Sequence, residues 1–195
     1  MSKTYGQYCG LARALDLVGD RWSLLIVREL LIAPARFRDL QAGLGSIATN
    51  LLTDRLNTLQ RAGVIERRTE GARPVYELTP LGAGLREPIE ALVRWSTPLM
   101  TPGPAEDRAD ARWLAVALPA LLAGKANGDG EEIAIRVDGV DLTLAAGDAG
   151  IEAEVRTRSS EREPHRVSMT TALAAAVLSE TWSDFRRSII QGAAI

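Results

Sequence analysis

The chain has 195 residues, of which 46% are hydrophobic and 25% charged, and its formal net charge is -2. This composition excludes a largely disordered chain, and the lack of any run of 18 apolar residues excludes a membrane span. One cysteine, Cys9, and one histidine, His165, exclude an intrachain disulfide and most metal sites. The first residues lack the order of a secretion signal. We therefore expect a cytoplasmic protein that is not an enzyme and that needs no cofactor or metal.

The charge is divided unequally along the chain. Residues 1–104 contain 13 basic and 10 acidic side chains, a net of +3, whereas residues 105–195 contain 10 and 15, a net of -5. Between them, the prolines and the glycine of residues 96–104 preclude a continuous helix. We predict two domains, residues 1–97 and 105–195, joined by a linker at 98–104. A basic half next to an acidic half indicates that the first domain faces a polyanion.

Helical periodicity dominates the first domain. Four apolar periodic segments predict helices that end before Gly19, Pro34, Gly45 and Gly63. The pattern then changes to two strand-like runs, Val64–Thr69 and Pro74–Leu78, followed by a long helix from Pro80 to Trp95 that Pro88 should kink. Two helices joined by a tight turn and followed by a basic hairpin are typical of a winged helix-turn-helix.

The fourth predicted helix, Ser46–Ala62, has two chemically different faces. At about 100° per residue, one side is apolar and should face the core through Ala48, Leu52, Leu56 and Leu59. The opposite side carries amides and hydroxyls, which can bond base edges or contact a thymine methyl. A plain solvated face is the alternative interpretation. We predict DNA contacts from Ser46, Thr49, Asn50, Thr53 and Asn57.

Arginines next to this helix strengthen the prediction. Arg67, Arg68 and Arg73 place cations on the hairpin, where they suit phosphates or a narrow minor groove. Arg55 instead falls on the apolar side of the helix, so we expect it to form an ion pair with one of three acids, Asp39, Glu29 or Asp16. The helix after the hairpin has an apolar stripe that one winged domain cannot cover alone. We predict a dimer interface there, formed by Leu81, Leu85, Ile89, Leu92 and Trp95.

A set of segments covers about residues 5–97 in order: Cys9, LVGDRWSLLIVREL from Leu17, RFRDL from Arg36, GSIATNLLTDRL from Gly45, GVIERR from Gly63, YELTPLG from Tyr76, and Trp95. Through these segments the first half of the chain resembles the HxlR family of winged-helix transcriptional regulators. The resemblance implies a homodimer in which the first and last helices of the domain form the interface. It also implies that Ser46–Ala62 enters the major groove of double-stranded operator DNA, with the hairpin as the wing. We expect a sequence-specific transcriptional repressor.

Some members of this family sense oxidants or electrophiles through an N-terminal cysteine. Cys9 precedes a predicted helix and is close in sequence to Lys3, two features that favour a reactive thiol. In contrast, Gly10 replaces the proline that follows the cysteine in the family. A small buried cysteine is the other interpretation. A redox- or electrophile-sensing regulator is therefore our alternative function.

The second half predicts an α+β domain. An apolar helix within 105–124 is followed by three alternating runs, Ile133–Val137, Leu142–Leu144 and Ile151–Val155, and by a fourth run at His165–Met169. Two helices follow, Thr171–Leu178 and one that contains Trp182. We predict an antiparallel sheet with one face covered by helices. The fold class for the whole chain is thus α+β, a winged helix-turn-helix domain followed by this smaller domain.

The second half also resembles the sterol carrier protein 2-like fold, through its element order and the stretch TTALAAAVL from Thr170. The resemblance implies an apolar small-molecule effector bound between sheet and helices, with Trp113, Trp182 and Phe185 as candidate pocket residues; ordinary core packing is the alternative for these aromatics. Two further functions stay open. A winged helix can bind protein rather than DNA, and His165 is an isolated candidate base for an enzyme, although no nucleophile motif accompanies it.

Overall fold

The computed structural model describes residues 4–70, 73–100, 106–126, 132–148, 150–156 and 164–191. It divides into two compact units, Met1–Ile89 and Glu90–Ile195. The division lies before the linker predicted at 98–104, of which residues 101–104 are outside the described ranges. The linker therefore stays a prediction.

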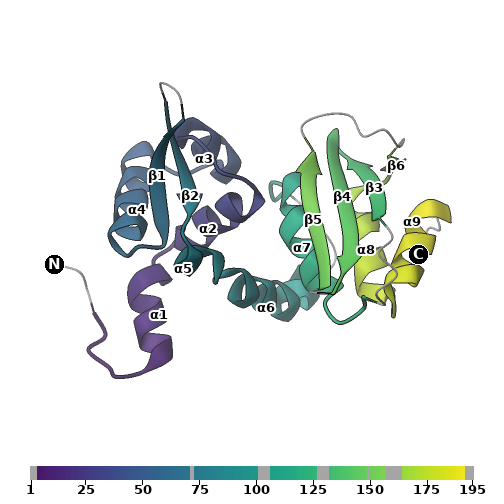
Figure 1. The fold of residues 1–195 in the computed structure, drawn as a ribbon, viewed down its shortest axis with the longest axis horizontal. Coiled ribbons are helices and arrows are strands. Elements are labelled where there is room, and N and C mark those ends of the chain that lie inside the picture. Colours follow the sequence, from purple (N-terminus) through teal and green to yellow (C-terminus); the bar gives the residue numbers. More distant parts are fainter. Residues whose placement is uncertain are drawn as a thin grey trace. The chain divides into compact units, whose positions relative to one another are not determined.

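In its described residues the first unit has the predicted order of four helices and a hairpin, and two helices follow where one was predicted (Figure 1). Its elements are α1 (Gly10–Val18), α2 (Ser23–Ile32), α3 (Phe37–Leu44), α4 (Thr49–Arg61), β1 (Ile65–Glu70), β2 (Arg73–Leu78), α5 (Pro80–Ala83) and the start of α6 (Arg86–Ser96). Glycines end two of the helices in the way that the sequence predicts. Gly45 follows α3 and Gly63 follows α4, both with positive φ, +74° and +71°, which side chains disfavour.

The apolar face of α4 packs into the core of the first unit. Leu52, Leu56 and Leu59 are buried together with Ile26 of α2 and Leu40 of α3. The prediction that Ala48 also faces the core is wrong, because it is the exposed N-cap of α4 and precedes the helical periodicity.

The hairpin pairs β1 and β2 in an antiparallel register that places Ile65 opposite Leu78 and Glu70 opposite Arg73. A third segment forms an isolated bridge with β2, a pairing that the sequence pattern did not reveal. Ala35, between α2 and α3, exchanges two backbone hydrogen bonds with Tyr76, 3.0 and 2.8 Å long. The helix-turn-helix and the hairpin are thereby connected through the backbone.

The single long helix predicted from Pro80 to Trp95 is two helices. α5 ends at Ala83 and α6 begins at Arg86, so Pro88 lies in the first turn of α6. Pro88 has no N–H for the carbonyl four residues earlier, that of Gly84, and its ring would clash with that carbonyl. The helix therefore breaks at Gly84–Leu85 instead of bending at Pro88.

In its described residues, the second unit contains the remainder of α6, two short 3-10 helices, a sheet and three further helices. The bounds are η1 (Thr97–Met100), η2 (Ala111–Trp113), α7 (Leu114–Leu121), β3 (Glu132–Val137), β4 (Val140–Gly147), β5 (Gly150–Arg156), β6 (His165–Arg166), α8 (Met169–Leu178) and α9 (Trp182–Gln191). The α+β class is confirmed. The apolar helix is shorter than predicted, because Asp110 caps η2 by accepting a hydrogen bond from the Arg112 N–H and α7 starts only at Leu114.

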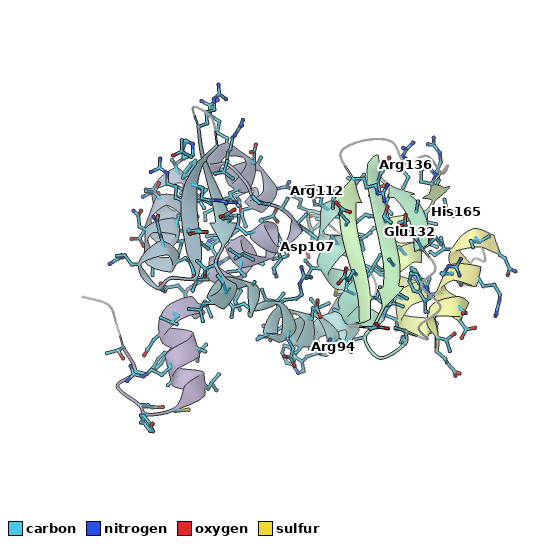
Figure 2. All side chains as sticks on the ribbon, viewed as in Figure 1. Arg94, Asp107, Arg112, Glu132, Arg136 and His165 are labelled. Atoms are coloured by element: carbon cyan, nitrogen blue, oxygen red, sulfur yellow. The ribbon has the colours of Figure 1, made fainter. Side chains whose placement is uncertain are left out.

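The sheet order is β5-β4-β3-β6, and α7 and α8 lie behind the strands in Figure 1. β3, β4 and β5 form the predicted antiparallel meander. The prediction of a wholly antiparallel sheet is wrong, since β6 pairs in parallel with β3. Arg136 of β3 and His165 of β6 are labelled in Figure 2, where these two strands pair. A connection between parallel neighbours must cross from one end of the sheet to the other, and strand periodicity does not encode this direction.

Each strand of the meander has one apolar and one polar face. Ile133, Ile135, Leu142 and Leu144 are buried, and Trp182 and Phe185 of α9 are completely buried, with ring centroids 5.6 Å apart. The polar face carries ion pairs instead. Arg136 pairs with Asp141, and the guanidinium of Arg156 lies 3.4 Å from the Glu132 carboxylate.

Candidate nucleic-acid interface

The polar face of α4 and the turn before it are exposed. All five residues predicted to contact DNA have exposed side chains, which are Ser46, Thr49, Asn50, Thr53 and Asn57. In the first turns of the helix two hydroxyls are oriented by hydrogen bonds. The Gln41 amide Nε2 of α3 donates to the Thr49 hydroxyl at 2.9 Å, and the Thr53 hydroxyl donates to the Thr49 carbonyl oxygen at 2.9 Å.

Gln41 was missed by the sequence reasoning. The only signal for it was its place on the helix before the tight turn of a helix-turn-helix, where the two helices approach each other. Helical periodicity identifies which residues of α4 face outward, but it does not identify the residues of neighbouring elements that contact them.

Arg55 anchors α4 to the segment before α2. Its side chain is only 17% exposed and forms ion pairs with Asp20 at 3.2 Å and Asp54 at 2.7 Å, and its Nε donates to the Arg21 carbonyl oxygen. The prediction of a partly buried ion pair is confirmed. The predicted partners Asp39, Glu29 and Asp16 are wrong, because Asp39 accepts the Arg36 N–H at the start of α3, Glu29 pairs with Arg28 and Asp16 lies near Arg13.

The three arginines of the hairpin are all exposed, but they differ in their partners. Arg68 forms an ion pair with Glu77. Arg67 and Arg73 form no ion pair with any side chain that the structure describes. Among the described side chains, two of the three predicted cations therefore have no acidic partner, and the sequence could not distinguish them from Arg68.

Thr79 joins the base of the hairpin to α5. Its hydroxyl hydrogen bonds to the carbonyl oxygens of Gly63, at 2.6 Å, and Val64, at 3.1 Å, and its oxygen accepts the N–H of Gly82. The hairpin and the helix after it are thus held together by one side chain.

The predicted dimer residues have unequal exposure. Leu81, Leu92 and Trp95 are exposed, Trp95 by 73%, whereas Leu85 is half-buried and Ile89 is buried within the chain. On α1, Leu11 and Leu15 are also exposed, 69% and 41%. Isolated exposed leucines are common, but rows of exposed apolar side chains on helices indicate surfaces that another chain covers.

Cys9 is exposed at the N-cap of α1, so the interpretation of a buried structural cysteine is wrong. Lys3, its suggested neighbour, is outside the described residues.

In the second unit, Trp113 is half-buried, and Trp182 and Phe185 stack in the core. A groove of about 450 Å³ instead involves Arg136, Asp138 and Arg166. The pocket formed by the three aromatic residues stays a prediction. Within the described ranges, no cluster of His, Cys, Asp and Glu is suited to a metal ion, and no helix has the length and apolar character needed to cross a bilayer.

Comparison of the sequence with known proteins identifies the family of the first half of the chain. The sequence model of the HxlR-like helix-turn-helix family matches residues 17–103. The HTH-type transcriptional regulator YvaP of Bacillus subtilis is 32% identical over 93 residues, which are 46% of this chain and 86% of YvaP. The HTH-type transcriptional regulator YodB of the same species is 30% identical over 93 residues, 46% of this chain and 83% of YodB.

Among solved structures, the quinone-bound YodB from B. subtilis is 27% identical, with 45% of this chain and 96% of that chain covered and a TM-score of 0.41. The sequence identity extends over most of the length of YvaP and YodB, and the matched residues include the α2–α4 and hairpin segments described above. The chain belongs to the HxlR-like helix-turn-helix family, whose members are transcriptional regulators.

Proposed function

We propose that the protein is a sequence-specific transcriptional repressor that binds double-stranded operator DNA as a homodimer. The observation that carries the proposal is the exposed strip of Thr and Asn on α4 next to a hairpin with two cations, Arg67 and Arg73, that lack acidic partners among the described side chains. The helix reads base edges, and the hairpin contacts phosphates or the minor groove.

Dimerisation is supported by the exposed apolar residues of α1, α5 and α6. A two-fold dimer places two copies of α4 about 34–36 Å apart, one helical turn of DNA, so the operator is pseudo-palindromic. Leu81, Leu92 and Trp95 supply contact area that a monomer leaves in water.

The second domain, which we propose has a sterol carrier protein 2-like fold, acts as the sensor for an apolar effector. Support comes from the meander with one apolar face against helices and from the acidic charge of residues 105–195, which disfavours approach to phosphates. An effector alters operator affinity only if it prefers one dimer conformation over another.

Selection of bound sequences from a random duplex pool, with the intact protein, tests DNA reading. We expect enrichment of a two-fold symmetric site. We also expect the logarithm of the binding constant to fall linearly with the logarithm of the salt concentration. A winged helix that binds only protein would enrich no site.

Displacement of a hydrophobic dye from the intact protein by apolar compounds tests the sensor. If no apolar compound displaces the dye or changes the affinity for the operator, the sensor proposal is contradicted.

A second function is favoured by the exposure of Cys9 at the start of α1. In this case oxidation or alkylation of the thiol changes operator affinity. The comparison is between the protein and Cys9→Ser, each treated with an electrophilic quinone before the DNA-binding measurement. A response that persists in Cys9→Ser contradicts thiol sensing.

A further inference from the structure

Two hydroxyls at the start of α4 have opposite hydrogen-bond polarity. The Thr49 hydroxyl accepts a hydrogen bond from the Gln41 amide nitrogen at 2.9 Å. An amide NH₂ group donates only, so it cannot take the hydrogen of the hydroxyl in return. Thr49 therefore keeps its own hydrogen for another acceptor, and no described residue supplies that acceptor.

The Thr53 hydroxyl is used in the reverse sense. Its hydrogen is donated to the Thr49 carbonyl oxygen at 2.9 Å, a common bond of Thr within helices. Its oxygen lone pairs and its methyl group are what remain for a partner. Both side chains are exposed.

Gln41 is half-buried on α3, whereas Thr49 is the first residue of α4. The N-terminal N–H groups of a helix and its dipole favour negative charge at this end. A hydroxyl that is held as a donor at the N-terminal end of α4 favours the same kind of partner as the helix dipole does, an atom with lone pairs and negative charge.

We propose that Gln41 is a positioning residue that fixes the Thr49 hydroxyl as a donor to a hydrogen-bond acceptor of DNA, while Thr53 offers an acceptor and a methyl group. The inference rests on the proposed DNA-reading function. The acceptor is a phosphate oxygen or a purine N7, which share this chemistry.

The test inverts the polarity without changing the shape. In Gln41→Glu, the carboxylate accepts only and draws the Thr49 hydrogen inward, whereas in Gln41→Met the bond is lost but the hydroxyl can still turn toward DNA. Each variant is made with Thr49 and with Thr49→Val, in the intact protein, and affinity is measured for the enriched duplex. Thermal unfolding confirms that all variants are folded.

We expect Gln41→Glu to weaken binding about three- to tenfold more when Thr49 is present than in the Thr49→Val background, the amount that one hydrogen bond contributes. The loss that remains in Thr49→Val measures the repulsion between the added carboxylate and DNA. Gln41→Met should weaken binding less than Gln41→Glu when Thr49 is present. Equal losses from Gln41→Glu in both backgrounds would show that Gln41 only tethers α3 to α4.

Modified DNA identifies the source of the acceptor. A methylphosphonate linkage removes one phosphate charge, and a 7-deazapurine removes one N7. At the position that Thr49 contacts, the modification should weaken binding by the wild-type protein but have little further effect on Thr49→Val. If the wild-type protein enriches a site but no modification shows this dependence, the inference fails alone; if no site is enriched, the proposed function fails and the inference with it.

Discussion

Gly82 lies so close to Val64 that a Cβ atom at position 82 would be 2.0 Å from the Val64 carbonyl oxygen and 3.1 Å from the Leu78 side chain. Val64 immediately precedes β1, and Gly82 is buried in α5. The glycine is thus required by the close approach of two backbones, where the Thr79 hydroxyl also joins them. The first turn of α5 can rest on the base of the hairpin only if position 82 has no side chain.

Gly82→Ala should therefore lower the free energy of unfolding of the first unit by about 1–3 kcal/mol, the usual cost of overpacking. Denaturant unfolding followed by far-UV circular dichroism measures it. Gly10→Ala is the matched control, because a Cβ there meets no atom within 4 Å and lies in helix α1. If both variants have the same stability, the contact with Val64 does not constrain the fold.

The residues proposed to read bases and those proposed to contact phosphates should respond differently to mutation. Asn50→Ala should reduce discrimination between the enriched duplex and random DNA by about 1–3 kcal/mol, since a lost base contact is sequence-specific. Arg67→Ala and Arg73→Ala should weaken binding to both duplexes and reduce the salt slope by about one unit each. Salt titrations of fluorescence anisotropy separate the two classes, and an unchanged salt slope would exclude phosphate contacts by the wing.

Trp95→Glu should convert the proposed homodimer to a monomer at micromolar concentration. The Trp95 side chain is 73% exposed in the single chain, so a charge there costs the fold little, whereas a charge in a hydrophobic interface has no partner. Size-exclusion chromatography with light scattering gives the mass. Gln191→Glu, exposed at the end of α9, controls for the added charge. A Trp95→Glu protein that stays dimeric places the interface elsewhere.

Asp141 should stabilise the second unit in a pH-dependent way. Its pKa is lowered from the ordinary value of 3.8 chiefly by the hydrogen bond from Arg136. Burial opposes this shift, and the charges of Arg136 and Arg166 add to it. A lowered folded-state pKa means that the stabilisation is complete above the unfolded value and is lost as the pH falls through the folded value.

The difference in unfolding free energy between the protein and Asp141→Asn should accordingly be constant near neutral pH and shrink below about pH 4. Urea unfolding across this range measures it. In an Arg136→Gln background the difference should be smaller and vary less with pH. A difference that is independent of pH in the wild-type background would mean that the ion pair does not contribute.

The order of elements in the first unit was readable from local sequence. Helix periods, the glycines after α3 and α4, and the change to alternating residues at Ile65 each act over a few residues, so they are visible without the fold. The apolar stripe of α4 likewise predicted both its buried side and the exposed Thr and Asn residues. Pro88 also indicated a disturbed helix, because a missing N–H and a ring clash are local effects, but the sequence predicted a kink at Pro88 and not the break at Gly84–Leu85.

Contacts between residues that are distant in sequence could be identified only from the tertiary structure. Asp20 rather than Asp39 meets Arg55, and Glu77 pairs with Arg68 but not with Arg67, because these choices depend on how segments approach in space. The parallel direction of β6 and the burial of Ile89 have the same origin. Gln41 is the clearest case: one hydrogen bond across the helix-turn-helix sets which way a hydroxyl on α4 points its hydrogen, and no periodicity in either helix contains that information.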